Sequence, residues 1–383
     1  MASVDEFRVQ VPDAVLEDLG RRLEHTRYPA PIPDAGWDYG TDDVYLRDLV
    51  AYWRHGYDWR AREARLNELP HATTEIDGQR IHFVHARSPA ADALPLLITH
   101  GWPGSVVEFL DVLGPLHDPA GHGADPADAF HVVAPSLPGY AFSGPTHERG
   151  WHPARVARAW SELMARLGYD RYVAQGGDWG AFVTSQLALA DPGHVAGIHL
   201  NMLFPDPGDT DPATYTPDEQ AGLDGLARMM DGEGGYFRIQ STRPHTLGFA
   251  LEDSPAGLCA WIVEKFRAWS DCDGDIERSF TKDQLLDNVM LYWVTGTPTS
   301  SVRFYAEFDR ALRSGALPFG ARVETPTGYA RYPKELISSS RRWAERQYNL
   351  VHFADMPRGG HFAAMEEPQL FVDDVRACFR PRR

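Results

Sequence analysis

Cysteine, basic residues and long apolar stretches are all scarce in this sequence. The 383 residues include 3 cysteines, Cys259, Cys272 and Cys378. They are odd in number and far apart, so they indicate neither a disulfide framework nor a zinc site. No apolar run approaches the roughly 20 residues that a membrane-spanning helix needs, and the opening residues lack the basic and apolar regions of a signal peptide. We therefore expect a cytoplasmic protein without a membrane partner.

Acidic residues outnumber basic ones. Lys and Arg together number 37 against 54 Asp and Glu, and the net charge is −17 at pH 7. An acidic surface repels phosphate backbones and anionic lipids, so nucleic acid is not an expected partner.

The chain also exceeds the usual size of a single core, which predicts one large domain with an insertion, or two domains.

The first 70 residues predict an N-terminal arm. Apolar residues recur at helical spacing over 13–26 and again over 42–56, with a Pro- and Gly-rich connection between the two segments. From residue 73 the period changes to two, and the Asp-Gly pair at 77–78 predicts a hairpin. We take 1–70 as the arm and 71–206 as the first part of a core.

Short, continuous apolar runs alternate with amphipathic helical segments in that core. Such runs are typical of parallel strands buried on both faces, and their alternation with helices predicts a doubly wound, mostly parallel α/β sheet. From 207 to 318 the alternation stops and the chain is mainly helical and aromatic, as expected of a lid inserted over a site. Strand patterns return in 319–383, the second part of the core. The four apolar runs of the first part of the core are residues 94–100, 129–136, 171–175 and 197–201.

Asp178 lies at the tip of a Gly-rich turn, "VAQGGDWGAF", between an apolar run and a helical segment. Gly176 and Gly180 give the small-residue spacing of a nucleophile elbow, in which a strained turn exposes one side chain. An aspartate here could simply cap the helix, but a cap does not need so many glycines. A dinucleotide fingerprint does not fit, because the G-x-G-x-x-G spacing is absent. We therefore interpret Asp178 as a nucleophile.

Two further turns follow predicted strands at the edge where ligands of open α/β sheets bind. The turn "HGWPGS" can place the backbone N–H of Trp102 opposite that of Trp179, as a pair of donors to an oxyanion. It also makes His100 a candidate. The loop "MPRGGHFAAMEEP" contains His361. A lone histidine is often structural, but the chain order nucleophile, acid, histidine favours a catalytic base.

The acid of such a set should lie between Asp178 and His361. Glu335 in "ARYPKELISSS" has this place, although it could also be a solvated glutamate at a helix start. Asp355 in "FADMP" is the competing acid. A third acidic segment, "DCDGDIERSFTK", lacks the Gly and terminal Glu positions of a calcium loop. We therefore expect no metal site there.

Several of these segments resemble the α/β-hydrolase-fold epoxide hydrolases of the microsomal type: "HGWPGS", "GGDWG", "YPKEL", "RGGHFAAMEEP", and "RLEHTRYP" in the arm. The resemblance covers nearly the whole chain. It implies that fold, with Asp178 as nucleophile, His361 as water-activating base and Glu335 as the acid orienting it. It also implies Tyr236 in "GYFRIQ" and Tyr305 in "RFYAE" as lid donors to the epoxide oxygen, which spacing alone would not select from 15 tyrosines.

The resemblance further implies hydrolysis of a small-molecule epoxide to a vicinal diol, without metal or organic cofactor. Attack by a carboxylate gives an ester that water can cleave, whereas attack by serine would leave a stable ether. The aromatic lid indicates an aryl or bulky epoxide, in detoxification or in secondary metabolism such as antibiotic biosynthesis. A haloalkane-type dehalogenase uses the same Asp, Glu and His and is the alternative. A catalytically silent ligand receptor is another class, and a homodimer is left open.

Overall fold

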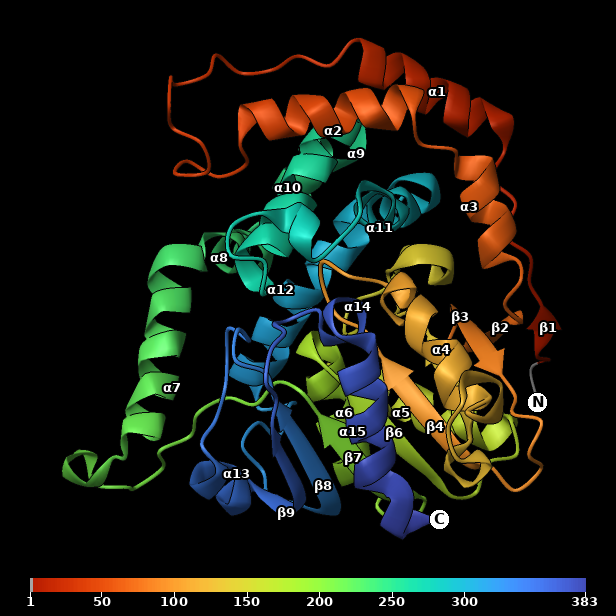
Figure 1. The fold of residues 1–383 in the computed structure, drawn as a ribbon, viewed down its shortest axis with the longest axis vertical. Helices are drawn as coiled ribbons and strands as arrows, with labels where there is room; N and C mark the ends of the chain where they lie inside the picture. Colours follow the sequence, from red (N-terminus) through yellow and green to blue (C-terminus); the bar gives the residue numbers. More distant parts are fainter. Residues whose placement is uncertain (1–2) are drawn as a thin grey trace.

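The computed structural model describes residues 3–383. Within that range, nine strands form one sheet in the order β1-β2-β3-β5-β4-β6-β7-β8-β9 (Figure 1). The strands from β5 to β9 are parallel, whereas β1, β2 and β3 add an antiparallel edge that joins β5. The strands are β1 (Asp5–Glu6), β2 (His71–Ile76), β3 (Gln79–Ala86), β4 (Leu94–Thr99), β5 (Phe130–Pro135), β6 (Tyr172–Gly176), β7 (Val195–Leu200), β8 (Val323–Arg331) and β9 (Tyr348–Asp355).

Burial on both faces explains the composition of the central strands. Every residue of β5 and β6 is buried, and β4 is buried at all but one position. Strands covered by helices on both faces lose the alternation of polar and apolar residues. The predicted mostly parallel α/β sheet is therefore confirmed. Its covering helices are α4 (Leu110–His117), α5 (Pro153–Arg166), α6 (Asp178–Ala190), α13 (Arg341–Gln347), α14 (Ala363–Glu366) and α15 (Pro368–Phe379).

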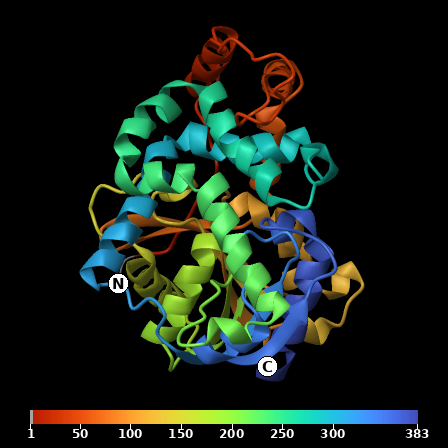
Figure 2. The same ribbon diagram turned by 90° about the vertical axis from the view of Figure 1, so that its left-hand side faces the viewer.

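A helical layer lies over the carboxyl ends of the parallel strands, between the sheet and the N-terminal helices in both views (Figures 1 and 2). Its chain leaves the sheet after β7 and returns at β8. A π-helical turn at Met229–Glu233 follows α7 directly, and the sequence did not predict it. The helices of this layer are α8 (Gly235–Thr242), α9 (Pro244–Asp253), α10 (Pro255–Trp269), α11 (Lys282–Thr295) and α12 (Pro298–Ser314). The preceding helix α7 (Pro217–Arg228) runs beside the sheet, at the left of Figure 1.

The N-terminal helices α1 (Asp13–Glu24) and α2 (Asp43–His55) cross the top of that layer, and α3 (Trp59–Leu66) descends beside it at the right of Figure 1. Polar contacts hold them there. The Tyr57 hydroxyl donates to Asp287 Oδ1 at 2.8 Å, and the Arg62 guanidinium pairs with the same carboxylate. Because Asp287 is buried on α11, the arm supplies the donors that a buried carboxylate requires. Short 3₁₀ turns lie at Val106–Phe109, Ala120–His122, Pro126–Asp128, Ala141–Ser143, Pro212–Thr214, Ile276–Arg278 and Arg380–Arg382.

Candidate active site

The turn between β6 and α6 holds Asp178 in a left-handed conformation, with φ of 47°. Such a conformation is strained for a residue with a side chain and occurs mostly at functional turns. The neighbouring glycines make the turn sterically feasible. A Cβ on Gly176 would lie 2.1 Å from the carbonyl oxygen of Gly180, and a Cβ on Gly180 would lie 1.9 Å from that of Thr99. The glycines are therefore needed for the close backbone packing that carries Asp178.

The Asp178 carboxylate has a different neighbour at each oxygen. The backbone N–H of Trp102 donates to Oδ1 at 2.8 Å, and Oδ2 lies 3.4 Å from His361 Nε2. A Cβ on Gly101 would lie 2.2 Å from Oδ1, so the turn before Trp102 can approach the carboxylate only because it has no side chain. Trp179 is next to Asp178 in the first turn of α6. The contribution of the Trp179 backbone N–H to an oxyanion hole stays a prediction.

His361 lies between two carboxylates. Its Nδ1 is 2.9 Å from Glu335 Oε1 and 3.1 Å from Oε2, while its Nε2 faces Asp178. Burial lowers the pKa of His361, but the negative charges of Glu335 and Asp178 outweigh burial and hold that pKa well above its usual range. The two negative charges thus favour the protonated imidazole, and loss of either charge would lower its pKa.

Of the two acids that the sequence offered, Glu335 contacts the histidine. It is 8 % exposed, and it lies in the segment after β8. Asp355, at the end of β9, instead forms an exposed ion pair with Arg331 at 2.6 Å. The chemistry of a base-orienting acid requires direct contact with the imidazole, so Glu335 fits the role and Asp355 does not.

His100 has a structural environment. Its Nε2 accepts the backbone N–H of Leu137 at 3.1 Å, and its Nδ1 lies 3.0 Å from the carbonyl oxygen of Gly101. Both ring nitrogens therefore have backbone groups as hydrogen-bond partners. Burial lowers the pKa of His100 to about 4, so the ring is neutral and fastens the HGWP turn to the loop after β5.

Tyr236 on α8 and Tyr305 on α12 converge above Asp178 from the helical layer. Their ring centroids are 5.8 Å apart, and both rings line a cavity of about 220 Å³ that Asp178 also lines. Burial is the main cause that raises the pKa of both phenols far above the usual value, so both remain protonated donors. The other lining residues are mostly apolar: Trp179, Phe182, Met202, Phe204, Leu226, Met229, Met230, Phe237, Phe308, Leu312, Phe319 and Ile337.

A second, more polar cavity of about 20 Å³ lies on another side of Asp178, and we call it the rear chamber. It contains His361 together with four polar side chains that the sequence analysis did not single out: Thr99, Glu108, Gln175 and Asn201. Glu108 stands four residues after the second glycine of "HGWPG", and Gln175 immediately precedes the elbow glycines. Their closeness to the two turns was the only sequence signal that could have indicated them.

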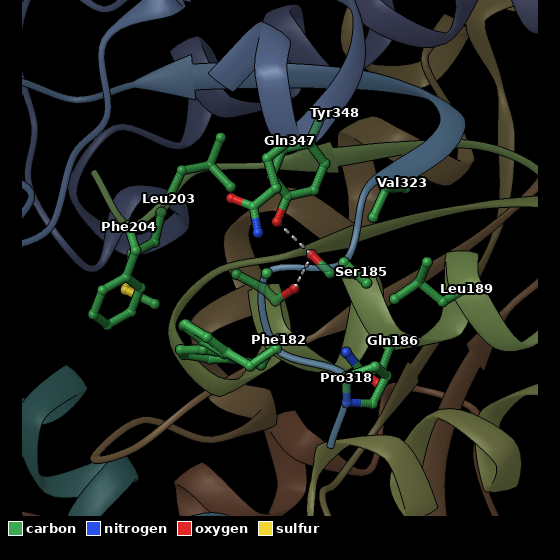
Figure 3. Close-up of a pocket in the computed structure, with 15 residues that line it drawn as sticks. Phe182, Ser185, Gln186, Leu189, Leu203, Phe204, Pro318, Val323, Gln347 and Tyr348 are labelled. Carbon is green, nitrogen blue, oxygen red and sulfur yellow. Dashed lines mark hydrogen bonds between the residues drawn. The ribbon is translucent and has the colours of Figure 1, made fainter. Parts of the chain in front are cut away.

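A third cavity, of about 40 Å³, lies behind α6 beside the start of β9 (Figure 3). The Ser185 and Tyr348 hydroxyls are hydrogen-bonded there at 3.1 Å. Neither Asp178 nor His361 lines this cavity, so it lacks the reacting groups. It adjoins the cavity under the tyrosines, because both are lined by Phe182, Met202, Phe204 and Phe319.

Within residues 3–383, no group of three or more His, Cys, Asp or Glu side chains is arranged to hold a metal ion. Over the same range, no helix combines the length and the apolar character needed to cross a membrane. The expected independence from cofactors stays a prediction.

The sheet order, the strained elbow and the Asp-His-Glu set define the class of α/β-hydrolase-fold enzymes. The chain matches the family described as the epoxide hydrolase N terminus over residues 4–109 and the α/β-hydrolase fold over residues 95–233. It is 38% identical to epoxide hydrolase 1 of Sus scrofa, over 98% of this chain and 88% of that protein. It is 47% identical to a Stigmatella aurantiaca protein named provisionally as an epoxide hydrolase, over 99% of this chain and 86% of that protein.

Solved structures agree with these matches. The juvenile hormone epoxide hydrolase of the silkworm Bombyx mori superposes with a TM-score of 0.91 at 35% identity, covering 100% of this chain and 95% of that one. The Aspergillus niger epoxide hydrolase superposes with a TM-score of 0.88 at 33% identity, covering 99% and 96%. The chain belongs to the epoxide hydrolase family, and the resemblance inferred from its motifs is confirmed. These matches do not favour a dehalogenase.

Proposed function

We propose that this epoxide hydrolase opens its substrate by attack of the Asp178 carboxylate and releases a vicinal diol when water hydrolyses the resulting ester. One observation carries the proposal. The Asp178 carboxylate faces an apolar cavity with two phenols, while its Oδ2 lies 3.4 Å from His361 Nε2. Nucleophile, proton donors and base thus surround the space where an epoxide carbon would react.

The two carboxylate oxygens have separate roles. Oδ1, held by the Trp102 N–H, becomes the carbonyl oxygen of the ester, and Oδ2 forms the bond to the epoxide carbon. When water later attacks Cγ, negative charge develops on Oδ1, where the Trp102 donor is already in place. A donor of this kind is worth roughly 3 to 4 kcal/mol in other hydrolases.

Tyr236 and Tyr305 supply the proton that the opening epoxide oxygen needs. An alkoxide is a strong base, and a phenol within the same cavity can donate to it as the carbon–oxygen bond breaks. The raised pKa of each phenol keeps its proton in place before the reaction.

The protonated state of His361 balances the protons of the cycle. Overall, the proton that His361 carries before the reaction replaces the proton that a tyrosine gives to the epoxide oxygen. Ester formation removes the charge of Asp178, which is one of the two charges that raise the His361 pKa, so the neutral imidazole becomes available as a base. Water then gives one hydrogen to His361 and one to the departing product oxygen, while its own oxygen stays in Asp178.

The substrate is an apolar epoxide, aryl-bearing or otherwise bulky. The cavity of about 220 Å³ under the tyrosines is lined largely by aromatic, Met and Leu side chains, which favour apolar ligands. The enzyme would meet such epoxides in detoxification or in secondary metabolism, such as antibiotic biosynthesis. We expect it to act in the cytoplasm. No nucleic-acid partner is proposed, and a homodimer stays an open alternative to a monomer.

Isotope labelling tests the covalent step. Excess enzyme in heavy-oxygen water should release a first-turnover diol without label, because the new diol oxygen comes from Asp178 Oδ2. Mass spectrometry of the Asp178 peptide should then show the label. Heavy oxygen in the first diol would mean direct attack by water, and would exclude the ester. Asp178→Asn, which keeps the shape of the side chain, is the control and should show neither diol nor label.

A further inference from the structure

The HGWPG turn lies against two carboxyl groups, and only one of them is the nucleophile. A Cβ on Gly101 would lie 2.2 Å from Asp178 Oδ1, and a Cβ on Gly104 would lie 1.5 Å from Glu108 Oε1. Each glycine therefore makes room for a different carboxyl group. The backbone N–H groups of Gly101 and Ser105 face the Glu108 carboxyl and lower its pKa.

Glu108 and Asp178 share the rear chamber with His361. The chamber also contains an unused acceptor. Gln175 is 1 % exposed, and its Nε2 donates to Asn201 Oδ1 at 2.9 Å, but its Oε1 has no hydrogen-bond partner within residues 3–383. A buried carbonyl oxygen without a donor is costly, and a polar chamber is where an ordered water can supply the donor.

Charge and burial also distinguish Glu108 from an ordinary surface glutamate. Burial raises the pKa of Glu108 to about 8, and the charge of Asp178 adds to that effect, whereas the charge of His361 and the two backbone N–H groups oppose it. At neutral pH the group is therefore mainly a carboxylic acid, with one O–H donor and one carbonyl acceptor. Such a group can orient a water without placing a second fixed charge beside Asp178.

We propose that Glu108 and Gln175 bind the hydrolytic water in the rear chamber and orient it between His361 Nε2 and the Cγ atom of Asp178. They are positioning residues, because His361 takes the proton and Asp178 carries the ester. The inference rests on the covalent route proposed above. It assigns the epoxide to the apolar cavity and the water to the rear chamber, so that the two reactants approach Asp178 from different cavities.

The proposed geometry gives each atom of the water a partner. One hydrogen points to His361 Nε2, the other points to Gln175 Oε1 or to the carbonyl oxygen of Glu108, and a lone pair faces Cγ. On attack the water oxygen bonds to Cγ, and the first hydrogen moves to His361. When the bond from Cγ to the diol oxygen breaks, the second hydrogen goes to that oxygen. Asp178 returns as a carboxylate.

Single-turnover kinetics of the full-length enzyme with styrene oxide separate the two half-reactions. Glu108→Leu and Gln175→Met remove the water partners, and each should slow ester hydrolysis by tenfold or more while the rate of ester formation stays within about threefold. The ester should then accumulate as a mass increment on the intact protein, with kcat and KM falling together. Glu108→Gln keeps a carbonyl acceptor and should restore most of the hydrolysis rate.

The matched control is Glu219→Gln. Glu219 is 1 % exposed and pairs with Arg342, but it lines neither cavity, so its loss should lower thermal stability without changing the ratio of the two rates. Normal hydrolysis in both Glu108→Leu and Gln175→Met, or an equal fall of both half-reactions, would overturn the assignment of the water. Absence of any ester in the wild-type enzyme would instead overturn the covalent route itself.

Discussion

The ring of Tyr236 stacks on the indole ring of Trp102, with centroids 5.2 Å apart and ring planes 10° from parallel. Trp102 is also the residue whose backbone N–H donates to Asp178. The Tyr305 ring stands perpendicular to the same indole, with ring centroids 5.7 Å apart. One buried tryptophan thus links the two lid phenols to the turn that holds the nucleophile, and movement of the lid would move the proton donors relative to Asp178.

Replacing the base should stop the reaction at the ester. In His361→Gln the ring nitrogen that faces Asp178 is lost, while the phenols and the nucleophile remain. We expect ester formation to continue and hydrolysis to slow by roughly 100-fold or more, because general-base catalysis typically contributes that much. Intact-protein mass spectrometry after addition of an epoxide should show a stable increment equal to the substrate mass. An unmodified mutant that turns over at the wild-type rate would exclude the role.

Removing both lid hydroxyls should block the first half-reaction. In the double variant Tyr236→Phe, Tyr305→Phe the opening epoxide oxygen has no donor, and we expect the rate of ester formation to fall by about 100-fold or more. Stopped-flow measurement of Trp fluorescence under single-turnover conditions would follow this step. Tyr332→Phe is the matched control, because that buried hydroxyl has no hydrogen-bond partner within residues 3–383. Full activity in the double variant would contradict the assignment.

The close approach of the HGWP turn can be tested with one methyl group. Gly101→Ala would place a Cβ 2.2 Å from Asp178 Oδ1, so either the carboxylate or the turn must move. A displacement of about 1 Å at a reacting group can cost roughly 100-fold in rate, and we expect kcat/KM to fall by at least this factor. Gly193→Ala, where a Cβ meets no atom within 4 Å, should keep wild-type kinetics. Equal activity in both variants would show that the contact is not needed.

Protonation of His100 should lower stability in acid. Burial lowers its pKa from 6.5 to about 4, so the neutral ring contributes stability that is fully present above pH 6.5 and is lost as the pH falls toward 4. The loss amounts to about 3 kcal/mol. Urea unfolding from pH 7 to pH 4 should show that the advantage of the wild type over His100→Gln shrinks by that amount. A difference that does not change with pH would show that His100 is not buried as a neutral ring.

The sequence predicted the sheet because its central strands are buried on both faces and so appear as continuous apolar runs. The elbow was visible for a related reason, since Gly176 and Gly180 are needed wherever backbones pack that closely. The roles of Tyr236 and Tyr305, by contrast, could not be predicted from the sequence pattern. Buried aromatic residues are common, and only the resemblance to a family singled out these two.

The tertiary structure decided which side chains contact one another, and the spacing of residues along the sequence could not decide this. Glu335, rather than Asp355, reaches the His361 ring, because the end of β9 points its aspartate to solvent and to Arg331. The structure also brought Glu108 and Gln175 into one chamber with the reacting groups, although they come from separate elements. Local sequence by itself determined the strands, the turns and the chemistry that Asp178 makes available. Which side chains share a cavity depends on how distant segments pack, and that is a property of the folded chain alone.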